Sequence, residues 1–355
     1  MIDSKKYFTK TLLGWNSRSN KRSMPWKGEK DPYKIWLSEI ILQQTRVEQG
    51  LAYYNRFVES FPNIVALATT KDTKIFKLWE GLGYYSRCKN LIATARTIAN
   101  DLNGRFPEKY EEILALKGVG PYTAAAIASF AFNLPYAVVD GNVFRVLSRY
   151  FGIHEPIDSS AGKKLFTALA EELLDKKSPG IYNQALMDFG ATVCKPANPL
   201  CKVCPLKTIC SAYLNDMVNE LPVKEKTIIK KNRWIYYLIA EHNGMVWVRK
   251  RGAGDIWENL YEFIRVESSK PISQNQLKKL KPFVDSLNGA FVTIKNISKE
   301  YRQQLSHQQI HGQFIFAKLN GPLKMKDHEA VTFKKLKKLP FPRFINTWLS
   351  ENSIG

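Results

Sequence analysis

The chain has 355 residues, 45% of them hydrophobic, so it is long enough for two domains, each with a core of its own. Lys and Arg outnumber Asp and Glu by 53 to 32, a formal net charge of +21, which excludes an acidic, solvating class of protein and favours a polyanionic partner. No run approaches ~20 apolar residues, so no membrane partner is expected.

The predicted elements change in character near residue 216. Before it, apolar residues recur at helical spacing and predict an all-α domain over residues 1–215. A polar, charged linker is expected at 216–232, followed by short β-type runs that predict a smaller α+β domain over 233–355. The helices are expected at 32–45, 47–59, 72–80, 84–100, 109–116, 121–131, 141–150, 161–174 and 179–190, and the strands at 234–240, 245–250, 291–295 and 313–319.

Glu39 lies in the first of these helices, on its apolar side. Ile35 is four residues before it and Leu42 three after, so the three side chains share one face. A carboxyl group there loses hydration, which raises its pKa and makes it a competent general acid near neutral pH. The alternative is a structural Glu that pairs with an Arg or caps a turn.

Two glycine-containing turns follow. Stiff planar and amide side chains could wedge into a base stack, namely Gln44 at the end of the Glu39 helix and Tyr84 in the segment GLGYYSR, although each alone is compatible with ordinary packing. The later segment LKGVGPYTA predicts a turn between two helices, with Gly118 and Gly120 permitting positive φ and close backbone approach. The helix that begins there, with Thr123 in its first turn, offers free N–H groups to a phosphate. The full pattern indicates a helix-hairpin-helix that binds the DNA backbone; a plain tight turn is the alternative.

Asp140 ends the apolar run PYAVVD and is expected to cap the next helix. A helix N-terminus favours an ionised carboxylate, so we expect Asp140 to stay anionic while Glu39 becomes protonated. Two carboxyl groups whose pKa values are shifted in opposite directions can serve as acid and charge stabiliser in glycosidic-bond cleavage.

Four of the five cysteines lie within 17 residues, at 194–210, with the spacing C-x6-C-x2-C-x5-C. Zinc ligands usually come as two close pairs, and only one such pair is present, so an iron–sulfur cluster is favoured over zinc. An odd number of cysteines, with no secretory signal in MIDSKKYFTK, argues against a disulfide scaffold and predicts a reducing, cytoplasmic location, on the nucleoid if the source is prokaryotic.

Together these motifs resemble those of the MutY-type adenine DNA glycosylases of the endonuclease III superfamily. The similarity is close from about residue 24 to residue 210 and looser beyond. The resemblance implies a base excision repair enzyme that removes adenine mispaired with 8-oxoguanine or guanine in duplex DNA and works as a monomer. It rests on MPWKGEKDPYKIWLSEIILQQTRV, GLGYYSR, LKGVGPYTAAAIASFAF, VVDGNVFRVLSR, NQALMDFGATVC and the four-cysteine loop.

The resemblance also implies roles for individual residues. Glu39 resembles the general acid that protonates the adenine, and Asp140 the carboxylate that stabilises the oxocarbenium-like sugar. Tyr122 and Asn142 correspond to further pocket residues. Bifunctional members of the superfamily carry a Lys at the position of Tyr122, so a monofunctional glycosylase is implied. Further correspondences are Gln44 and Tyr84 to residues inserted near the lesion, and Cys194, Cys201, Cys204 and Cys210 to the ligands of a [4Fe–4S] cluster.

The C-terminal part resembles the family's 8-oxoguanine-recognition domain, which has a Nudix-like fold. Ser306 and His307 stand at the family's Phe-Ser-His, with Leu305 in place of Phe. The acidic motif of active Nudix enzymes is absent from the sequence, so nucleotide hydrolysis is not expected. Two alternatives remain: a bifunctional pyrimidine-damage glycosylase/lyase, and a non-catalytic iron–sulfur protein that binds nucleic acid.

Overall fold

The computed structural model describes residues 3–225, 230–283, 287, 290 and 292–352. The chain divides into two compact units, of which the first comprises residues 1–68 and 93–226, and the second residues 69–92 and 227–355. None of the helices in the described residues is long and apolar enough to cross a membrane.

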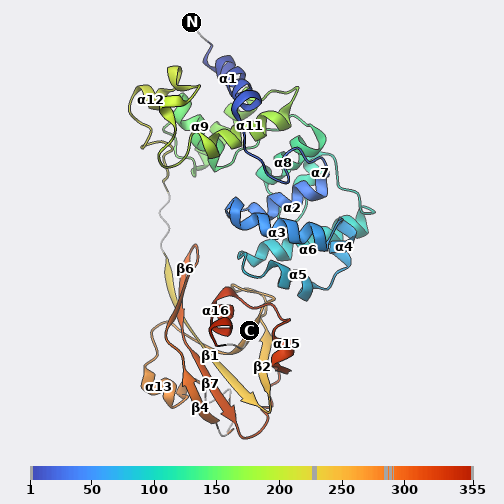
Figure 1. Ribbon diagram of the computed structural model, residues 1–355, viewed down its shortest axis with the longest axis vertical. Helices are drawn as coiled ribbons and strands as arrows, with labels where there is room; N and C mark the ends of the chain where they lie inside the picture. Colours follow the sequence, from blue (N-terminus) through green and yellow to red (C-terminus); the bar gives the residue numbers. More distant parts are fainter. Residues whose placement is uncertain (1–2, 226–229, 284–286, 288–289, 291, 353–355) are drawn as a thin grey trace. The chain divides into compact units, whose positions relative to one another are not determined.

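The first unit is helical (Figure 1). It contains α1 (Ser4–Ser19), α2 (Pro32–Leu42), α3 (Val47–Ser60), α4 (Ile64–Thr69), α7 (Tyr110–Leu114), α8 (Pro121–Phe132), α9 (Gly141–Phe151), α10 (Ser160–Leu173), α11 (Pro179–Thr192), the short η1 (Cys201–Val203) and η2 (Lys207–Ile209), and α12 (Ser211–Leu214). Helix α6 (Tyr85–Asp101) begins in the second unit and ends in the first.

Helix α2 begins and ends for identifiable reasons. Asp31 caps it by accepting a hydrogen bond from the Tyr33 amide at 2.9 Å, and Pro32 occupies its first position. It ends at Leu42, three residues earlier than the sequence predicts, because Gln44 adopts a left-handed conformation with φ of 53°. The residues between Leu42 and α3 therefore form a turn rather than a last helical turn.

Helix α11 is the central support of the first unit, and it packs against α1, α8 and α9. Its approach to α8 is close: a Cβ at Gly180 would lie 2.7 Å from the carbonyl oxygen of Ser129, so only glycine fits. Buried residues of α1, α9, α10 and α11 form one hydrophobic core, which includes Phe8, Leu147, Phe166 and Phe189.

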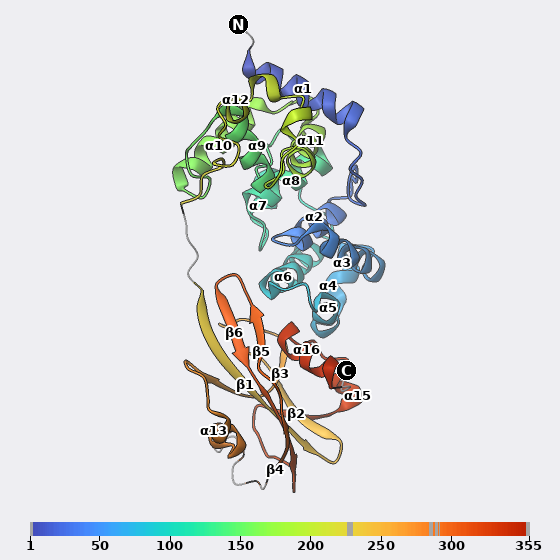
Figure 2. The same cartoon turned by 60° about the vertical axis from the view of Figure 1, so that its left-hand side comes forward.

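The second unit is built on a mixed sheet of eight strands in its described residues (Figure 2). The strands are β1 (Lys231–His242), β2 (Met245–Lys250), β3 (Tyr261–Ser268), β4 (Val292–Ile297), β5 (Tyr301–Gln304), β6 (Gln308–Gly312), β7 (Phe314–Leu319) and β8 (Glu329–Thr332). Their order is β4-β7-β1-β3-β2-β8, with β6 also pairing with β1 and with β5. The pairs β1–β6 and β1–β7 are parallel, and the others are antiparallel.

Alternation along β1 explains why both faces of the sheet are covered. Tyr236 and Leu238 face the side of α13 (Gln274–Lys278) and η3 (Lys281–Phe283). Tyr237, between them, packs on the opposite side against Phe344 of α16 (Arg343–Glu351), which is preceded by α15 (Phe333–Leu336). The result is a sheet with helices on both faces, which confirms the predicted α+β class of this domain.

Residues 69–92 belong to the second unit although they lie within the predicted helical domain. They contain α5 (Asp72–Trp79) and the first turns of α6. The Phe341 amide donates to the Glu80 carboxylate at 2.7 Å, and the Lys77 ammonium donates to the Leu339 carbonyl at 3.1 Å. The Lys89 ammonium lies 2.6 Å from the Glu258 carboxylate.

The structure modifies several predicted boundaries. Strand β1 begins at Lys231, inside the predicted linker 216–232, because the sheet pairing with β6 extends that far; residues 226–229 of that linker and residue 291 of a predicted strand lie outside the described residues. The predicted elements did not include helices α1, α4, α12, α13, α15 and α16 or strands β3, β5, β6 and β8.

Candidate active site and cysteine pocket

Glu39 is buried in the middle of α2, with 5% of its surface exposed. Burial raises the pKa of its carboxyl group to about 7, the hydrogen bond with the Tyr122 hydroxyl lowers it, and the negative charge of Asp140 raises it further. The predicted apolar face is therefore confirmed, and the bonding partner is a phenol rather than an Arg. An acid with this pKa can both donate and accept a proton near neutral pH.

Asp140 caps α9, as its sequence predicts. Its Oδ1 accepts from the Val143 amide at 2.7 Å, and its Oδ2 accepts from Asn142 Nδ2 at 2.7 Å. Asn142 in turn accepts from Arg145 Nη2 at 2.8 Å. The structure thus brings four of the predicted pocket residues together, since Tyr122 hydrogen bonds with Glu39 and feels the charge of Asp140.

The expectation that the two carboxyl groups shift in opposite directions is wrong. The pKa of Asp140 is raised, because burial outweighs the hydrogen bonds from Val143 and Asn142 that lower it. The cap and the helix N-terminus act in the predicted direction, but desolvation is larger. The environments of the two groups still differ: backbone donors lower the pKa of Asp140, whereas no backbone donor acts on Glu39, whose pKa is raised to about 7.

The hairpin between α7 and α8 has one glycine in the left-handed region, Gly118, with φ of 79°. Gly120 has an extended backbone, and a Cβ there would meet nothing within 4 Å, so the space in front of α8 is open. Thr123 is 2% exposed and its hydroxyl accepts from Gln43 Nε2 at 3.2 Å. The Thr123 side chain is thus turned inward, and the first N–H groups of α8 are what the hairpin offers to a phosphate.

Gln44 and Tyr84 both lie at turns and both have positive φ, 53° and 48°. Non-glycine residues pay on the order of 1 kcal/mol or more for this conformation, which clusters at functional sites. Gln44 is exposed, and Tyr84 is 43% exposed. Within the second unit, the Tyr84 hydroxyl hydrogen bonds with the Ser306 hydroxyl, at the tip of the β5–β6 hairpin that also presents His307.

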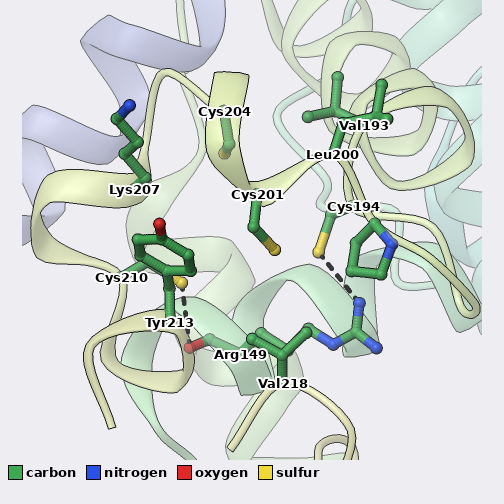
Figure 3. Close-up of a pocket in the computed structure, with 11 residues that line it drawn as sticks. Arg149, Val193, Cys194, Leu200, Cys201, Cys204, Lys207, Cys210, Tyr213 and Val218 are labelled. Carbon is green, nitrogen blue, oxygen red and sulfur yellow. Dashed lines mark hydrogen bonds between the residues drawn. The ribbon is translucent and has the colours of Figure 1, made fainter. Parts of the chain in front are cut away.

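The four cysteines of the loop line one pocket with about 330 Å³ of empty space, including its opening to solvent (Figure 3). Cys194 lies two residues after the end of α11, Cys201 begins η1, and Cys204 and Cys210 directly follow η1 and η2. Arg149 Nη1 donates to the Cys194 sulfur at 3.6 Å, and the Cys210 thiol donates to the Arg149 carbonyl at 3.5 Å.

The chemistry of the pocket is compatible with a metal centre. Burial raises the pKa of the thiols of Cys201, Cys204 and Cys210, that of Cys204 to about 12, so bound metal is needed to keep them as thiolates. Four thiols that line one pocket form a donor set of the kind that soft metal ions and iron–sulfur clusters use. In the described part of the chain, which includes all four cysteines, no three His, Cys, Asp or Glu side chains are placed so as to hold a single ion.

Sequence reasoning missed two buried arginines of α9 that join these sites. Arg145 donates to the Cys194 carbonyl from Nε at 2.7 Å, as well as to Asn142, and Arg149 donates to the Lys195 carbonyl at 2.8 Å. Both are nearly fully buried, although Arg rarely is unless it is paired. The signal available in the sequence was their spacing of four residues on the helix that Asp140 caps.

Comparisons with known proteins agree with this arrangement. A family described as "HhH-GPD superfamily base excision DNA repair protein" matches residues 37–173, and a NUDIX domain family matches residues 235–351. An adenine DNA glycosylase of Buchnera aphidicola subsp. Baizongia pistaciae is 37% identical over 309 residues, which cover 86% of this chain and 84% of the relative. An adenine DNA glycosylase of Mus musculus is 41% identical over 215 residues, 58% of this chain and 42% of the relative.

Two solved structures resemble the helical part. One is a thermostable thymine-DNA glycosylase, with a TM-score of 0.55 and 33% identity over 59% of this chain and 97% of its own. The other is an endonuclease III bound non-covalently to DNA, with a TM-score of 0.52 and 20% identity over 61% of this chain and 99% of its own. The second likeness concerns the fold alone, and it agrees with the predicted helix-hairpin-helix architecture.

The burial of Glu39 predicts a pH-dependent stability. Because its pKa in the folded chain, about 7, exceeds the ordinary value of 4.5, the folded state loses stability as the pH rises from 4.5 through 7. Glu39→Gln removes this loss. The free energy of unfolding of the variant, relative to that of the unmodified chain, should therefore increase over that interval by on the order of 3 kcal/mol and then level off. Chemical denaturation at a series of pH values measures it. Glu172→Gln, at an exposed carboxylate, is the matched control, and parallel curves for both variants would contradict the burial of Glu39 as the cause.

Proposed function

The chain belongs to the adenine DNA glycosylase family, an enzyme family that hydrolyses N-glycosidic bonds in DNA, and we propose that its substrate is adenine paired with 8-oxoguanine, or with guanine, in duplex DNA. We propose further that it is monofunctional and acts as a monomer in the cytoplasm. The observation that carries the chemistry is the buried Glu39, whose pKa near 7 suits a group that protonates the departing base.

Each residue of the pocket has a separate role in the proposed reaction. Glu39 in its protonated form donates to the adenine, which makes the base a better leaving group. The Tyr122 hydroxyl holds the Glu39 carboxyl by a hydrogen bond. As the bond to the sugar breaks, positive charge develops on the sugar, and the carboxylate of Asp140, oriented by Asn142 and by the Val143 amide, stabilises that charge.

The monofunctional mechanism is supported by the chemistry of Tyr122. A lyase of this superfamily needs an amine in the pocket to form an imine with the sugar, and a phenol cannot form one. With Tyr122 occupied in the bond to Glu39, water is the nucleophile, and the ionised Glu39 left after proton donation can accept a proton from it.

Discrimination of 8-oxoguanine is proposed for the β5–β6 hairpin. The base differs from guanine at O8 and at N7–H, which a hydroxyl or an imidazole can meet with a hydrogen bond. Ser306 and His307 present these groups at the hairpin tip, and Tyr84 adds an exposed planar ring beside Ser306. Leu305, in place of an aromatic residue, leaves the hydrogen-bonding groups as the readers.

We propose that Cys194, Cys201, Cys204 and Cys210 hold a [4Fe–4S] cluster. When bound, the cluster supplies four metal–sulfur bonds that cross-link the loop, and positive charge that keeps the thiols ionised. Arg149 supports the same site through its contact with the Cys194 sulfur.

Glu39→Gln keeps the size of the side chain and removes the acid. We expect excision from an adenine:8-oxoguanine duplex to slow by about 10²- to 10⁴-fold, the usual contribution of a positioned acid–base group. The wild-type rate should fall as the pH rises through about 7, because the acid is then ionised. A single-turnover assay on end-labelled duplex measures both. Strand breaks should appear only after hot alkali; breaks without alkali would contradict the monofunctional mechanism, and an active Glu39→Gln would contradict the assignment of the acid.

The cysteine pocket predicts a coloured protein. Purified under conditions that preserve iron, it should contain iron and sulfide in equal amounts, with little zinc and with absorption in the visible range. Cys204→Ala should lose the colour and lower the thermal stability, while Cys88→Ala, a buried cysteine outside the loop, should keep the colour. Stoichiometric zinc in protein expressed with ample iron would contradict the cluster.

The hairpin predicts a loss of discrimination without a loss of chemistry. Ser306→Ala with His307→Ala should lower excision opposite 8-oxoguanine toward the rate opposite guanine, with each lost base contact amounting to roughly 1–3 kcal/mol. Excision opposite guanine should change little. The measurement is the ratio of the two single-turnover rates, with Lys326→Ala, on an exposed loop of the same unit, as the control. A double variant that keeps the full ratio would exclude this hairpin as the reader.

A further inference from the structure

Asp188 is a buried carboxylate for which the proposed chemistry has no use. It lies on α11 with none of its surface exposed, and it accepts four hydrogen bonds from side chains. Its Oδ1 accepts from Arg22 Nη1 and Gln184 Nε2, both at 2.9 Å, and its Oδ2 accepts from Asn20 Nδ2 at 2.8 Å and Lys27 Nζ at 2.9 Å. Both cations are themselves only about a quarter exposed, at 23% and 27%.

Three of these four donors belong to residues 20–27, the connection between α1 and α2. The connection is also bonded to itself, since the Arg22 amide donates to Asn20 Oδ1 at 3.1 Å and Lys27 Nζ donates to the Arg22 carbonyl at 2.9 Å. It therefore wraps around the carboxylate of Asp188. Helix α2, which carries Glu39, begins five residues after Lys27.

The same turn of α11 contacts the other half of the active site. At Gly190, two residues after Asp188, a Cβ would lie 2.6 Å from Asn142 Cβ, so α9 approaches α11 as closely as a glycine allows. The Gly190 carbonyl accepts from Arg145 Nη2 at 2.7 Å. Asn142 and Arg145 belong to the hydrogen-bonded group that orients Asp140.

We propose that Asp188 is a positioning residue for base excision: by anchoring residues 20–27 to α11, it fixes the helix that carries Glu39 relative to the helix end that carries Asp140. The two carboxyl groups act on one nucleotide, and a misplacement of about 1 Å in such a site can cost about 10²-fold in rate. A buried carboxylate with two cations resists displacement, because removing either partner leaves an unpaired buried charge. This inference rests on the proposed roles of Glu39 and Asp140.

The test is Asp188→Asn, which keeps the shape and removes the charge. Single-turnover excision from an adenine:8-oxoguanine duplex should slow by about 10- to 100-fold, while the affinity for a duplex with a non-cleavable adenosine analogue changes little. The pH above which the rate falls should move down, because a displaced α2 admits water to Glu39 and alters its contacts with Tyr122 and Asp140, the groups that face it. A purely structural role would lower the melting temperature and leave this pH profile unchanged.

Matched variants decide between these outcomes. Glu172→Gln removes a surface carboxylate that contacts Lys5 of α1 at 2.6 Å. This control variant should leave the rate and the pH profile unchanged. Lys27→Met and Arg22→Gln each remove one of the two partly exposed cations that pair with Asp188. These variants replace Asp188→Asn in the test if that variant does not fold. Normal rates and pH profiles in these variants, measured well below their melting temperatures, would overturn the proposal. If Glu39→Gln is inactive in the same assay, the proposed function survives that result.

Discussion

Burial of the Glu39 carboxyl group is the constraint on which the site depends. An ionised carboxylate at that place has lost its water and has a second carboxyl group near it, so the folded chain favours the protonated form up to about pH 7. Apolar residues of α2 are buried with it, among them Ile35, which lies four residues before Glu39 on the same face. Their packing offsets the free-energy cost of burying the Glu39 carboxyl group, and the hydrogen bond from Tyr122 lowers that cost.

The second carboxyl group is held by a different principle. Asp140 has backbone and side-chain donors, and the side-chain donor Asn142 is held by Arg145, which also binds the backbone of the cysteine loop at the Cys194 carbonyl. The orientation of Asp140 therefore depends on the path of the loop as well as on its own helix. Burial raises the pKa of both carboxyl groups, but Asp140 accepts hydrogen bonds from the Val143 amide and from Asn142, whereas Glu39 has the Tyr122 hydroxyl.

Much of this arrangement is legible in the sequence, and the exceptions have physical reasons. The apolar spacing around Glu39, the Asp140 cap and the cysteine spacing each depend on residues that are near one another in the sequence, so they can be predicted from it. The sign of the pKa shift at Asp140 is not local, because desolvation comes from residues distant in the chain. Thr123 lies where a phosphate contact was expected, but its hydroxyl meets Gln43 from another helix. Strand β3 was missed because its sequence, YEFIRVES, does not alternate as a half-exposed strand does; it is central and covered on both faces.

The grouping of residues 69–92 with the C-terminal sheet has a consequence for how such a protein can be taken apart. In the sequence these residues lie within the helical part of the chain, but in the structure they contact residues of the C-terminal domain. The contacting pairs are Glu80 and Phe341, Lys77 and Leu339, and Lys89 and Glu258. A cut in the chain near residue 226 therefore separates residues 69–92 from the sheet and breaks these three contacts. Exchange of the sheet domain between two relatives would preserve them only if residues 69–92 were exchanged with it.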